Sequence, residues 1–365
     1  MALSADKSGG TTIYAALAEK LREKIRAGHL APGDLIGSEH ELSRQENISR
    51  MTVRKASDLL IQEGLLERRP GKGLYVAGSP TLANSIVQIV AGNLMWETAM
   101  QLARGVQQSA STYGIHVQLY DAHGDVDLDL QVIDQLPTTK IKGAVIISLH
   151  NPRFSAAICR LHASGFPFVL LDQRMRDIEV SAVTADNYGG GAAMGQHFVA
   201  KGHRQVAFIG DLIAVTVQER LAGFRDALAE AGVPLRRAMI RDLTAGIERF
   251  GDWSSNIRET TEQLMAAPDR PTAIFCSCDA IAVQVYKTLE MLGLNVSADV
   301  SVAGFDDDPL DAYLKPALTT VRQPFMEMGT AAMQLLRERI DRPTNPPQFH
   351  ALPVTLVERD SIRQL

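Results

Sequence analysis

The sequence predicts an α/β protein in which a small N-terminal helical domain with a β-hairpin precedes a larger body of parallel sheets. Two capped helices and a glycine hairpin follow one another in Ser38–Val76, and short apolar runs alternate with amphipathic helices from Ser85 onward. Such alternation is typical of βα units and parallel sheets. A turn-rich segment separates the two patterns. We therefore expect domains at 11–78 and 85–365, joined by a linker at 79–84.

Local capping signals define two helices near the N-terminus. Ser38 and Glu41 form an S-x-x-E capping box, in which each side chain satisfies the backbone amide of the other residue. That helix is expected to end near Asn47, and the hydroxyl of Ser49 is placed to cap the next helix. The second helix has a core face at helical spacing, made of Val53, Ala56, Leu59 and Leu60.

Two arginines at the start of the second helix suggest contact with DNA. Arg50 and Arg54 lie four residues apart, so both project from one helix face. A helix N-terminus that presents arginine, threonine and unpaired amides suits phosphates and guanine edges in a major groove. Taken alone, arginine at a helix start is more often simply solvated. The DNA-binding interpretation depends on the hairpin that comes next in the chain.

A basic hairpin completes the N-terminal domain. Two short strands, Leu65–Arg69 and Leu74–Val76, flank a Pro-Gly-Lys-Gly turn at 70–73. Its glycines allow a close approach to a phosphate backbone. Two helices and a hairpin in this order predict a winged helix-turn-helix that binds double-stranded DNA. The residues expected to touch DNA are Ser38, Glu39, Ser49, Arg50, Thr52, Arg54, Lys72 and Gly73.

The N-terminal segment resembles the GntR family of bacterial transcription regulators from about Ile13 to Gly78. The matching strings are YAALAEKLREKIRAGHL, APGD, SE, SRMTVRKA and GLL…GKGLYV. Two residues depart from the family pattern: Gly37 stands where proline is usual, and Leu74 where a small hydroxyl residue usually follows the wing glycine. We expect Gly37 to loosen the approach to the capped helix and Leu74 to remove a phosphate donor.

The charge distribution restricts nucleic-acid binding to the N-terminal domain. The 365-residue chain has a net charge of −5, but residues 1–80 hold 12 Lys and Arg against 10 Asp and Glu, a net of +2. The remainder carries −7. An acidic surface repels a polyanion, so we expect DNA to contact only the first domain.

Several other classes of protein are disfavoured by the composition. Three cysteines do not make a disulfide framework, and the two that lie close together, Cys276 and Cys278, would need two more ligands nearby to bind zinc. Met1–Thr12 has no apolar run typical of a secretory signal, and no apolar stretch of about 18 residues would span a membrane. No catalytic, metal-binding or dinucleotide motif is recognisable. We expect a cytoplasmic protein that is not an enzyme, with no metal and no cofactor.

The body is too long for one core, which favours two α/β lobes. Facing parallel sheets form a cleft where the carboxyl ends of their strands converge, and ligands of such sheets usually bind there. The helices expected in the body include Thr98–Tyr113, Gly189–Ala200, Arg220–Ala231 and Ala280–Leu292. The expected strands are Ile86–Ala91, Val117–Tyr120, Gly143–Ile147, Phe168–Leu171, Val206–Ile209, Ala273–Cys276 and Ser301–Ala303.

The body resembles the effector-binding core of the LacI/GalR repressors, which is related to periplasmic sugar-binding proteins. The matching strings are KGHRQVAFIG, ERLAGFRDALAEAG, PTAIFCSCDAIA, DVSVAGFDDDPL and LTTVRQP. A GntR head on this core resembles regulators of the arabinose-repressor type. The resemblance implies a periplasmic-binding-protein-like pair of lobes joined by three crossing strands, one near Leu318–Gln323. It also implies a homodimer that pairs through Thr98–Tyr113 and Ala280–Leu292, which would match a palindromic operator.

A sugar needs carboxylate and guanidinium groups for its hydroxyls and an aromatic face for its C–H patch. Asp306 follows a predicted strand, and Arg220 is expected to open a helix beside it. The resemblance assigns these two to the hydroxyls and Trp253 to stacking. It further suggests the cleft positions Asp172, Asp279, Gln323 and Ser148, and more loosely Trp96 or Glu97.

Structural roles compete with these assignments. Asp306 to Asp308 could form a solvated turn, Trp253 could anchor a lobe, and Asp279 could only cap the helix at Ala280. Cys278 stands where the LacI/GalR pattern has asparagine, which removes an amide donor. We therefore expect a ligand-responsive transcriptional repressor whose effector is a sugar or sugar derivative. The alternatives are a purine- or nucleoside-responsive regulator of the same architecture, and a sugar-binding protein or enzyme that does not bind DNA.

Overall fold

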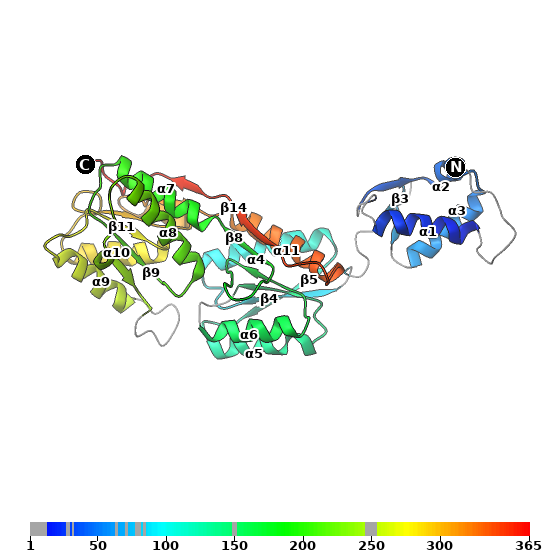
Figure 1. Cartoon of the computed structure of the whole chain (residues 1–365), viewed down its shortest axis with the longest axis horizontal. Coiled ribbons are helices and arrows are strands. Elements are labelled where there is room, and N and C mark those ends of the chain that lie inside the picture. Colours follow the sequence, from blue (N-terminus) through cyan, green and yellow to red (C-terminus); the bar gives the residue numbers. More distant parts are fainter. Residues whose placement is uncertain are drawn as a thin grey trace. The chain divides into compact units, whose positions relative to one another are not determined.

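The chain divides into two compact units (Figure 1). The first, called the head below, comprises Met1–Ser85 with Tyr113–Ile115, and the second, called the body, comprises Ile86–Thr112 and His116–Leu365. No helix among the placed residues is long and apolar enough to cross a membrane. The computed structural model describes residues 13–26, 30, 33–62, 65–69, 72–76, 82, 85–147, 152–244 and 254–365.

The head is a three-helix domain with a small antiparallel sheet of order β1-β3-β2. Its core is built from one apolar face of each helix and the inner residues of the sheet, including Leu17, Leu42, Val53, Leu60 and Leu74. Its elements are α1 (Ile13–Arg26), β1 (Leu35–Gly37), α2 (Glu39–Glu46), α3 (Arg50–Gln62), β2 (Leu66–Arg69) and β3 (Gly73–Val76).

The predicted capping box is confirmed at the start of α2. The Glu41 amide donates to Ser38 Oγ at 3.2 Å, and the Ser38 amide donates to Glu41 Oε2 at 2.7 Å. Asn47 ends this helix in a left-handed conformation, with φ of 53°. The signal was readable because every partner lies within a few residues along the chain.

The N-terminal lobe of the body is built on a six-stranded parallel sheet of order β14-β8-β7-β6-β4-β5. Helices α4 and α11 lie on one face and α5 and α6 on the other (Figure 1). The strands are β4 (Ile86–Ala91), β5 (His116–Asp121), β6 (Ala144–Ile147), β7 (Phe168–Leu171), β8 (Ala182–Ala185) and β14 (Phe349–Leu352). The helices are α4 (Glu97–Thr112), α5 (Val126–Gln135), α6 (Pro152–Ala163) and α11 (Phe325–Asp341).

The C-terminal lobe has a four-stranded parallel sheet of order β10-β9-β11-β12. One face of this sheet packs against α7 and α8 and the other against α9 and α10, each with its own apolar cluster. The strands are β9 (Val206–Gly210), β10 (Ile240–Asp242), β11 (Ala273–Cys276) and β12 (Ser301–Ala303). The helices are α7 (Asn187–Ala200), α8 (Val215–Glu230), α9 (Ser254–Ala266) and α10 (Asp279–Met291).

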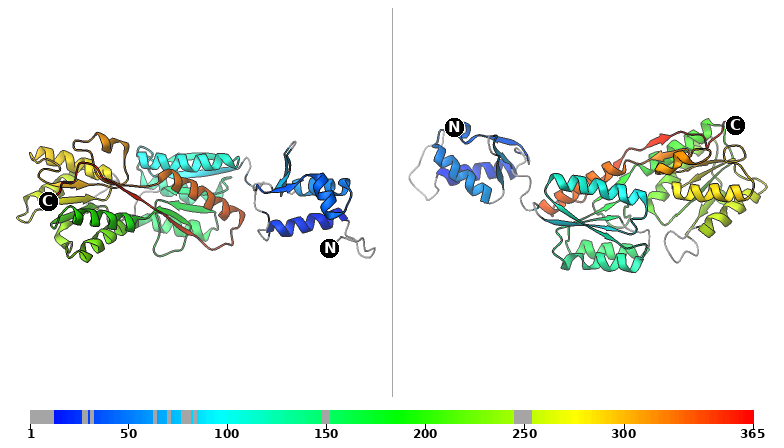
Figure 2. Two further views of the ribbon diagram at one scale, coloured as in Figure 1. Left: turned by 90° about the horizontal axis from the view of Figure 1, so that it is seen from above. Right: turned by 180° about the vertical axis from the view of Figure 1, so that it is seen from behind.

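The chain crosses between the lobes three times. It passes from β8 into α7, from β12 through β13 (Thr320–Arg322) into α11, and from β14 into β15 (Thr355–Val357). The second and third crossings pair with each other, because β13 and β15 form an antiparallel ribbon. The last crossing is the red segment in Figure 2. The predicted crossing near Leu318–Gln323 is therefore confirmed.

The predicted fold class is confirmed, but one helix start was wrong. The helix expected from Arg220 begins at Val215, which places Arg220 in its second turn. The N-cap is Ala214, which has no side-chain oxygen, so the sequence carries no capping signal there. The other predicted helices and strands of the body begin and end within two residues of the positions expected.

Candidate effector site and DNA-binding surface

The N-terminus of α3 presents two exposed arginines. The Thr52 amide donates to Ser49 Oγ at 3.1 Å, and the two hydroxyls lie 2.8 Å apart, so Ser49 caps the helix as predicted. Arg50 and Arg54 are both exposed. Among the described residues of the head, the ion pairs involve other side chains, which leaves both guanidinium groups available to an external anion.

Glu39 is held inside the head. Its carboxylate accepts a hydrogen bond from Arg68 at 2.8 Å, and Arg68 also donates to Asp58 at 2.9 Å. Arg68 therefore ties the start of α2 to the middle of α3 and to strand β2. A direct role for Glu39 at a base edge would require it to leave this ion pair.

The hairpin is fixed by a close approach between two glycines. Gly37 has φ of 125° and Gly73 has φ of 113°, and a Cβ at Gly73 would lie 3.0 Å from the Gly37 carbonyl oxygen. Proline cannot adopt a positive φ, so glycine at position 37 gives the chain a different path from the family's usual proline. Leu74 is buried in the head core and Lys72 is exposed. Pro70 and Gly71 lie outside the described residues.

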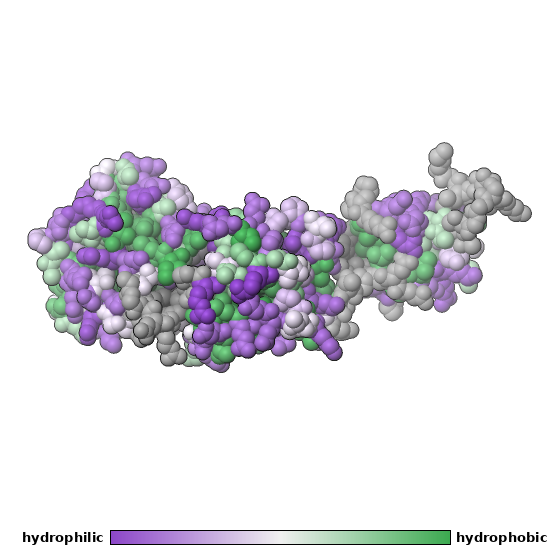
Figure 3. Space-filling view, turned by 60° about the horizontal axis from the view of Figure 1, so that its bottom comes forward, coloured by the Kyte–Doolittle hydropathy of each residue, from purple (hydrophilic) through white to green (hydrophobic). Residues whose placement is uncertain are grey.

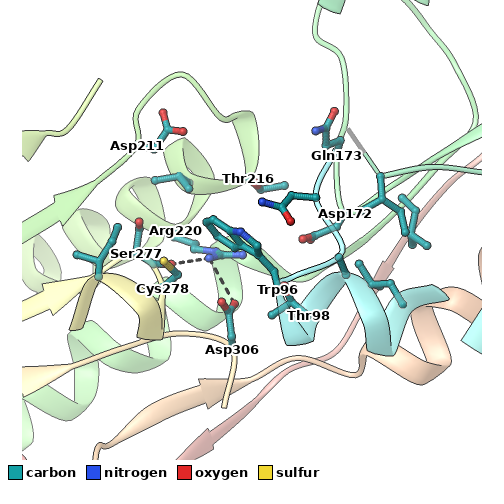
Figure 4. Close-up of a pocket in the computed structure, with 17 residues that line it drawn as sticks. Trp96, Thr98, Asp172, Gln173, Asp211, Thr216, Arg220, Ser277, Cys278 and Asp306 are labelled. Atoms are coloured by element: carbon teal, nitrogen blue, oxygen red, sulfur yellow. Dashed lines mark hydrogen bonds and ion pairs between the residues drawn. The ribbon is translucent and has the colours of Figure 1, made fainter. Parts of the chain in front are cut away.

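A cleft of about 870 Å³, part of it open to solvent, lies between the two lobes of the body. Its lining comes largely from residues that follow strands of both sheets, as expected for facing parallel sheets. Figure 4 shows these side chains pointing into a common space. The polar and aromatic residues that line it are Asn93, Trp96, Thr98, Asp172, Gln173, Asp211, Thr216, Arg220, Ser277, Cys278 and Asp306.

Arg220 is the central cation of the cleft. It is only 5% exposed, and its guanidinium donates to Asn187 Oδ1 at 2.8 Å and to the Ser277 carbonyl oxygen at 2.5 Å. The same group lies 3.8 Å from the Asp306 carboxylate and stacks 3.8 Å from the centre of the Phe305 ring. These contacts fix the guanidinium plane before any ligand arrives.

The backbone of α8 is held close to α7 where Arg220 is attached. A Cβ at Gly191 would lie 2.0 Å from the Arg220 carbonyl oxygen, and one at Gly223 would lie 2.0 Å from the Tyr188 carbonyl oxygen. Any side chain at either glycine would force the two helices apart. Gly191 and Gly223 thus allow α8, which carries Arg220, to pack closely against α7.

Asp306 is the carboxylate that faces Arg220. Its side chain is 14% exposed and accepts a hydrogen bond from Gln323 Nε2 at 2.6 Å. Burial raises the pKa of Asp306 well above its ordinary value, and the charges of Asp279 and Asp172 act in the same direction, although Arg220 opposes them. A buried carboxylate poised in this way gains from hydroxyl donors supplied by a ligand.

The N-terminal lobe contributes Trp96, Asp172 and Gln173. Figure 4 shows Asp172 and Gln173 on the side of the cleft away from Arg220, whereas Trp96 packs against an apolar cluster of the C-terminal lobe. Asp172 follows β7 in a left-handed conformation with φ of 60°. Trp96 precedes α4 and offers the only indole among the described lining residues. The cleft therefore combines one aromatic ring and one cation, Arg220, with carboxylates from both lobes.

The predicted site residues divide into three groups. Asp306, Arg220, Asp172 and Trp96 line the cleft. Gln323 lies behind it, where its amide orients Asp306. Ser148 and Trp253 fall outside the described residues, and Glu97 is directed to Arg104 at 3.8 Å rather than to the cleft.

Asp279 is not among the described residues that line the cleft. Its carboxylate is buried and accepts hydrogen bonds from Thr320 Oγ1 at 2.7 Å and from the Asp308 amide at 3.1 Å. Nor does it cap α10, which begins at Asp279 itself and has Cys278 at the N-cap. It instead ties β13 and the loop after β12 to the start of α10.

Six polar lining residues were missed by the sequence interpretation. Each follows a strand or starts a helix at the cleft, so the rule that located Asp306 could also have found most of them. Cys278 was noted for its departure from asparagine, and it does line the cleft. Burial raises the pKa of its thiol, so it contributes as a small apolar group rather than as a thiolate. The missed residues are Asn93, Thr98, Gln173, Asp211, Thr216 and Ser277.

Comparison with known proteins identifies both parts of the chain. The model of the bacterial regulatory proteins of the gntR family matches residues 13–76, and that of the periplasmic binding protein-like domain matches residues 196–362. The crystal structure of a LacI family transcriptional regulator from Enterococcus faecium, with bound ribose, has a TM-score of 0.65 at 25% identity. That comparison covers 77% of this chain and 100% of the regulator.

Two curated relatives are transcriptional repressors. The arabinose metabolism transcriptional repressor of Halalkalibacterium halodurans is 27% identical over 378 residues, which cover 96% of each protein. The ribose operon repressor of Escherichia coli is 31% identical over 263 residues, which cover 72% of this chain and 77% of the repressor. The chain belongs to the bacterial transcriptional repressors of the LacI type, in the branch that carries a GntR-family DNA-binding head.

Proposed function

We propose that this chain represses transcription from a palindromic operator and that a sugar bound between the lobes controls its affinity for that DNA. The observation that carries the proposal is the Arg220–Asp306 pair, which stands 3.8 Å apart at a cleft lined from both lobes. Vicinal hydroxyls are bound by such pairs, because the guanidinium donates while the carboxylate accepts. Among the described lining residues, we recognise no arrangement of side chains typical of an enzyme active site.

A pentose suits the cleft better than a purine does. Its hydroxyls would meet Asp306, Arg220, Asp172 and Gln173, and its C–H face would stack on Trp96. A purine would want two stacking rings, and the described lining offers one. The names of the relatives point the same way, since they include repressors of arabinose metabolism and of a ribose operon and a regulator with ribose bound.

The head is proposed to bind the major groove through α3 and the backbone through its wing. Arg50 and Arg54 would reach base edges or flanking phosphates, while the exposed Lys72 would reach backbone. The Ser49 and Thr52 hydroxyls and the amide of Gly73 would add phosphate contacts. Ser38 and Glu39 would align the start of α2 with the DNA, Glu39 through its ion pair with Arg68.

A homodimer is proposed to match the two-fold symmetry of the operator. The visible face of the body in Figure 3 mixes hydrophilic and hydrophobic residues. In the C-terminal lobe, large apolar side chains remain exposed at the end of α10 (Met291) and in the short helix Pro309–Tyr313, where Leu310 is 66% and Tyr313 80% exposed. The Tyr286 hydroxyl on α10 donates to the Pro316 carbonyl oxygen at 3.1 Å, which ties α10 to the segment that follows the short helix. A second copy of the chain would bury them.

Control would follow from a shift between two arrangements of the lobes. If the sugar binds one arrangement more tightly, and that arrangement holds operator less well, each ligand lowers the affinity of the chain for the other by the same factor. We expect the sugar to be the inducer. The head itself need not change its fold.

A sugar panel tests the proposal. D-ribose, L-arabinose and several hexoses would be screened by thermal denaturation of the full chain, because a ligand at 100 times its Kd adds about 2.7 kcal/mol to the free energy of unfolding. A pentose should raise the Tm and release a DNA fragment selected from a random pool. Stabilisation by a purine nucleoside and by no sugar would replace the effector assignment. Failure to select any DNA would end the assignment as a repressor.

A further inference from the structure

Two consecutive carboxylates after β12 serve different partners. Asp306 points into the cleft towards Arg220, whereas Asp307 turns away from it. Both adopt a positive φ, 125° for Asp306 and 63° for Asp307. Aspartate tolerates the second value but rarely the first, which lies outside the left-handed basin. Such a backbone persists only where its surroundings over-determine it.

Asp307 is clamped by two arginines. Arg322 Nε donates to Asp307 Oδ2 at 2.6 Å, and Arg359 Nη2 donates to Asp307 Oδ1 at 2.5 Å. The Asp307 carboxylate is 10% exposed, so solvent screens these charges only weakly. Arg359 is anchored in turn, because its other amino group donates to the Leu318 carbonyl oxygen at 2.7 Å and its amide to Thr319 Oγ1 at 2.9 Å.

The clamp comes from the strands that cross between the lobes. Arg322 is the last residue of β13, and Arg359 stands two residues after β15. The backbone of Asp306 joins the same ribbon, because its amide donates to the Val321 carbonyl oxygen at 2.8 Å. Gln323, the next residue of that segment, donates to the Asp306 carboxylate at 2.6 Å. The crossing segments therefore fix Asp306 in three ways: they bond its backbone amide, they bond its carboxylate, and they bond the carboxylate of the next residue, Asp307.

We propose that Asp307 is a positioning residue for effector binding: its two-arginine clamp keeps the strained turn that aims the Asp306 carboxylate at Arg220. The inference deepens the proposed function and rests on it for the identity of the ligand. Without the clamp, the turn relaxes towards an ordinary φ and the Asp306 carboxylate leaves the position facing Arg220. Arg322 and Arg359 belong to the crossing segments, so a movement of the lobes displaces both arginines. Through Asp307, that displacement changes the direction in which the Asp306 carboxylate points.

The test uses Asp307→Asn, which keeps the shape of the side chain and removes its charge. Asp308→Asn is the matched control: it removes the same charge one residue away, where the carboxylate only caps the Leu310 amide at 2.9 Å. Two readouts are taken on the full chain. One is hydrogen exchange at the Asp306 and Gln323 amides without ligand, and the other is the Kd for D-ribose and L-arabinose by calorimetry.

Asp307→Asn should speed exchange at these amides at least tenfold and weaken sugar binding at least tenfold, while Asp308→Asn stays within threefold of wild type. Arg359→Gln should do more than Arg322→Gln, because the side chain of Arg359 is 19% exposed and that of Arg322 57%. Arg359→Gln and Arg322→Gln each remove one arginine of the clamp, so they also test the proposal if Asp307→Asn fails to fold.

A lower Tm with unchanged exchange and unchanged Kd would show a merely structural role and overturn the proposal. Equal effects of Asp307→Asn and Asp308→Asn would overturn it as well. If the wild type binds neither sugar, the effector assignment fails, and the exchange measurement still decides whether the clamp holds the turn.

Discussion

The DNA-facing surface of the head and the effector cleft of the body use arginine in opposite ways. Arg50 and Arg54 lie exposed on α3, without an acidic partner among the described residues of the head. Arg220 is buried and already holds Asn187, the Ser277 carbonyl oxygen and the face of Phe305. The first arrangement suits a long polyanion that supplies its own counter-charge. The second suits a small neutral ligand that must find its partners in place.

Specificity has a different physical origin in each region. Exposed cations gain affinity from any phosphate backbone and need base edges to discriminate. A buried guanidinium fixed by three neighbours discriminates by geometry, because a ligand that misplaces one hydroxyl leaves a buried polar group unsatisfied. Substitutions should therefore cost more in the cleft than at the head, and they should differ in their dependence on salt.

The largest effect is expected from Arg220→Met. Removal of the guanidinium leaves the Asp306 carboxylate buried without its cation, and breaking a buried pair typically costs about 3–5 kcal/mol. Calorimetry should detect no pentose binding, and thermal denaturation should show a lower Tm. Arg236→Met serves as the control, because Arg236 pairs with Asp269 on the surface of the same lobe. Pentose binding by Arg220→Met at the wild-type Kd would remove this residue from the site.

A second effect concerns a buried acid pair beside the cleft. Burial and the neighbouring carboxylate of Asp279 raise the pKa of Asp311 to about 9. A carboxyl whose folded-state pKa is raised keeps its proton on folding, so its contribution to stability is present at low pH and is lost as pH rises from about 4 towards 9. Asp311→Asn abolishes this loss.

The free energy of unfolding of Asp311→Asn, relative to wild type, should therefore rise with pH by up to about 1.4 kcal/mol per unit across that window. Urea denaturation at pH 5, 6, 7 and 8 measures it. A difference between variant and wild type that does not change with pH would show that Asp311 is ionised in the folded protein.

At the head, Arg54→Ala should cost about 1–3 kcal/mol in affinity for a selected operator if the arginine reads a base, and the preference at that base pair should relax. Lys24, exposed on α1, offers a matched control outside the proposed surface. Fluorescence anisotropy with the selected duplex and with a scrambled duplex separates the two effects. An equal loss on both duplexes would reassign Arg54 to the phosphate backbone.

The smallest effect is expected at the wing. Lys72→Ala should weaken all duplexes alike and reduce the slope of log K against log salt by about one, because one phosphate contact is lost. Titrations at several salt concentrations give the slope directly. Pentose binding in the cleft should show no comparable salt dependence, since the ligand is neutral. A slope equal to that of the wild type would place Lys72 away from the DNA.

How far the sequence predicts each region depends on how local the contacts are. The capped helices of the head were predicted because Ser38, Glu41 and Ser49 bond to near neighbours, and the strands of the body because their apolar runs are buried on both faces. The start of α8 was missed because Ala214 leaves no capping signal. The contacts that hold Asp279 were not predicted, because its partners Thr320 and Asp308 lie 41 and 29 residues away along the chain.

The clamp on Asp307 shows the limit most clearly. Its arginines stand 15 and 52 residues further along the chain and meet only when both crossing segments are folded. No local pattern distinguishes Asp307 from Asp306 or Asp308, and in the sequence all three belong to one acidic turn. The backbone conformation separates their roles, because it turns one carboxylate to the cleft and the next to the ribbon.

In the proposed mechanism, a sugar held by Arg220 and Asp306 controls the affinity of the head for DNA. The direct measurement is the Kd of the full chain for its selected operator with and without a saturating pentose, in wild type and in Asp306→Ala. The pentose should weaken operator binding by wild type at least tenfold, and Asp306→Ala should bind operator normally but no longer respond to the pentose. A full response in Asp306→Ala at wild-type pentose concentrations would contradict it and would place the effector elsewhere.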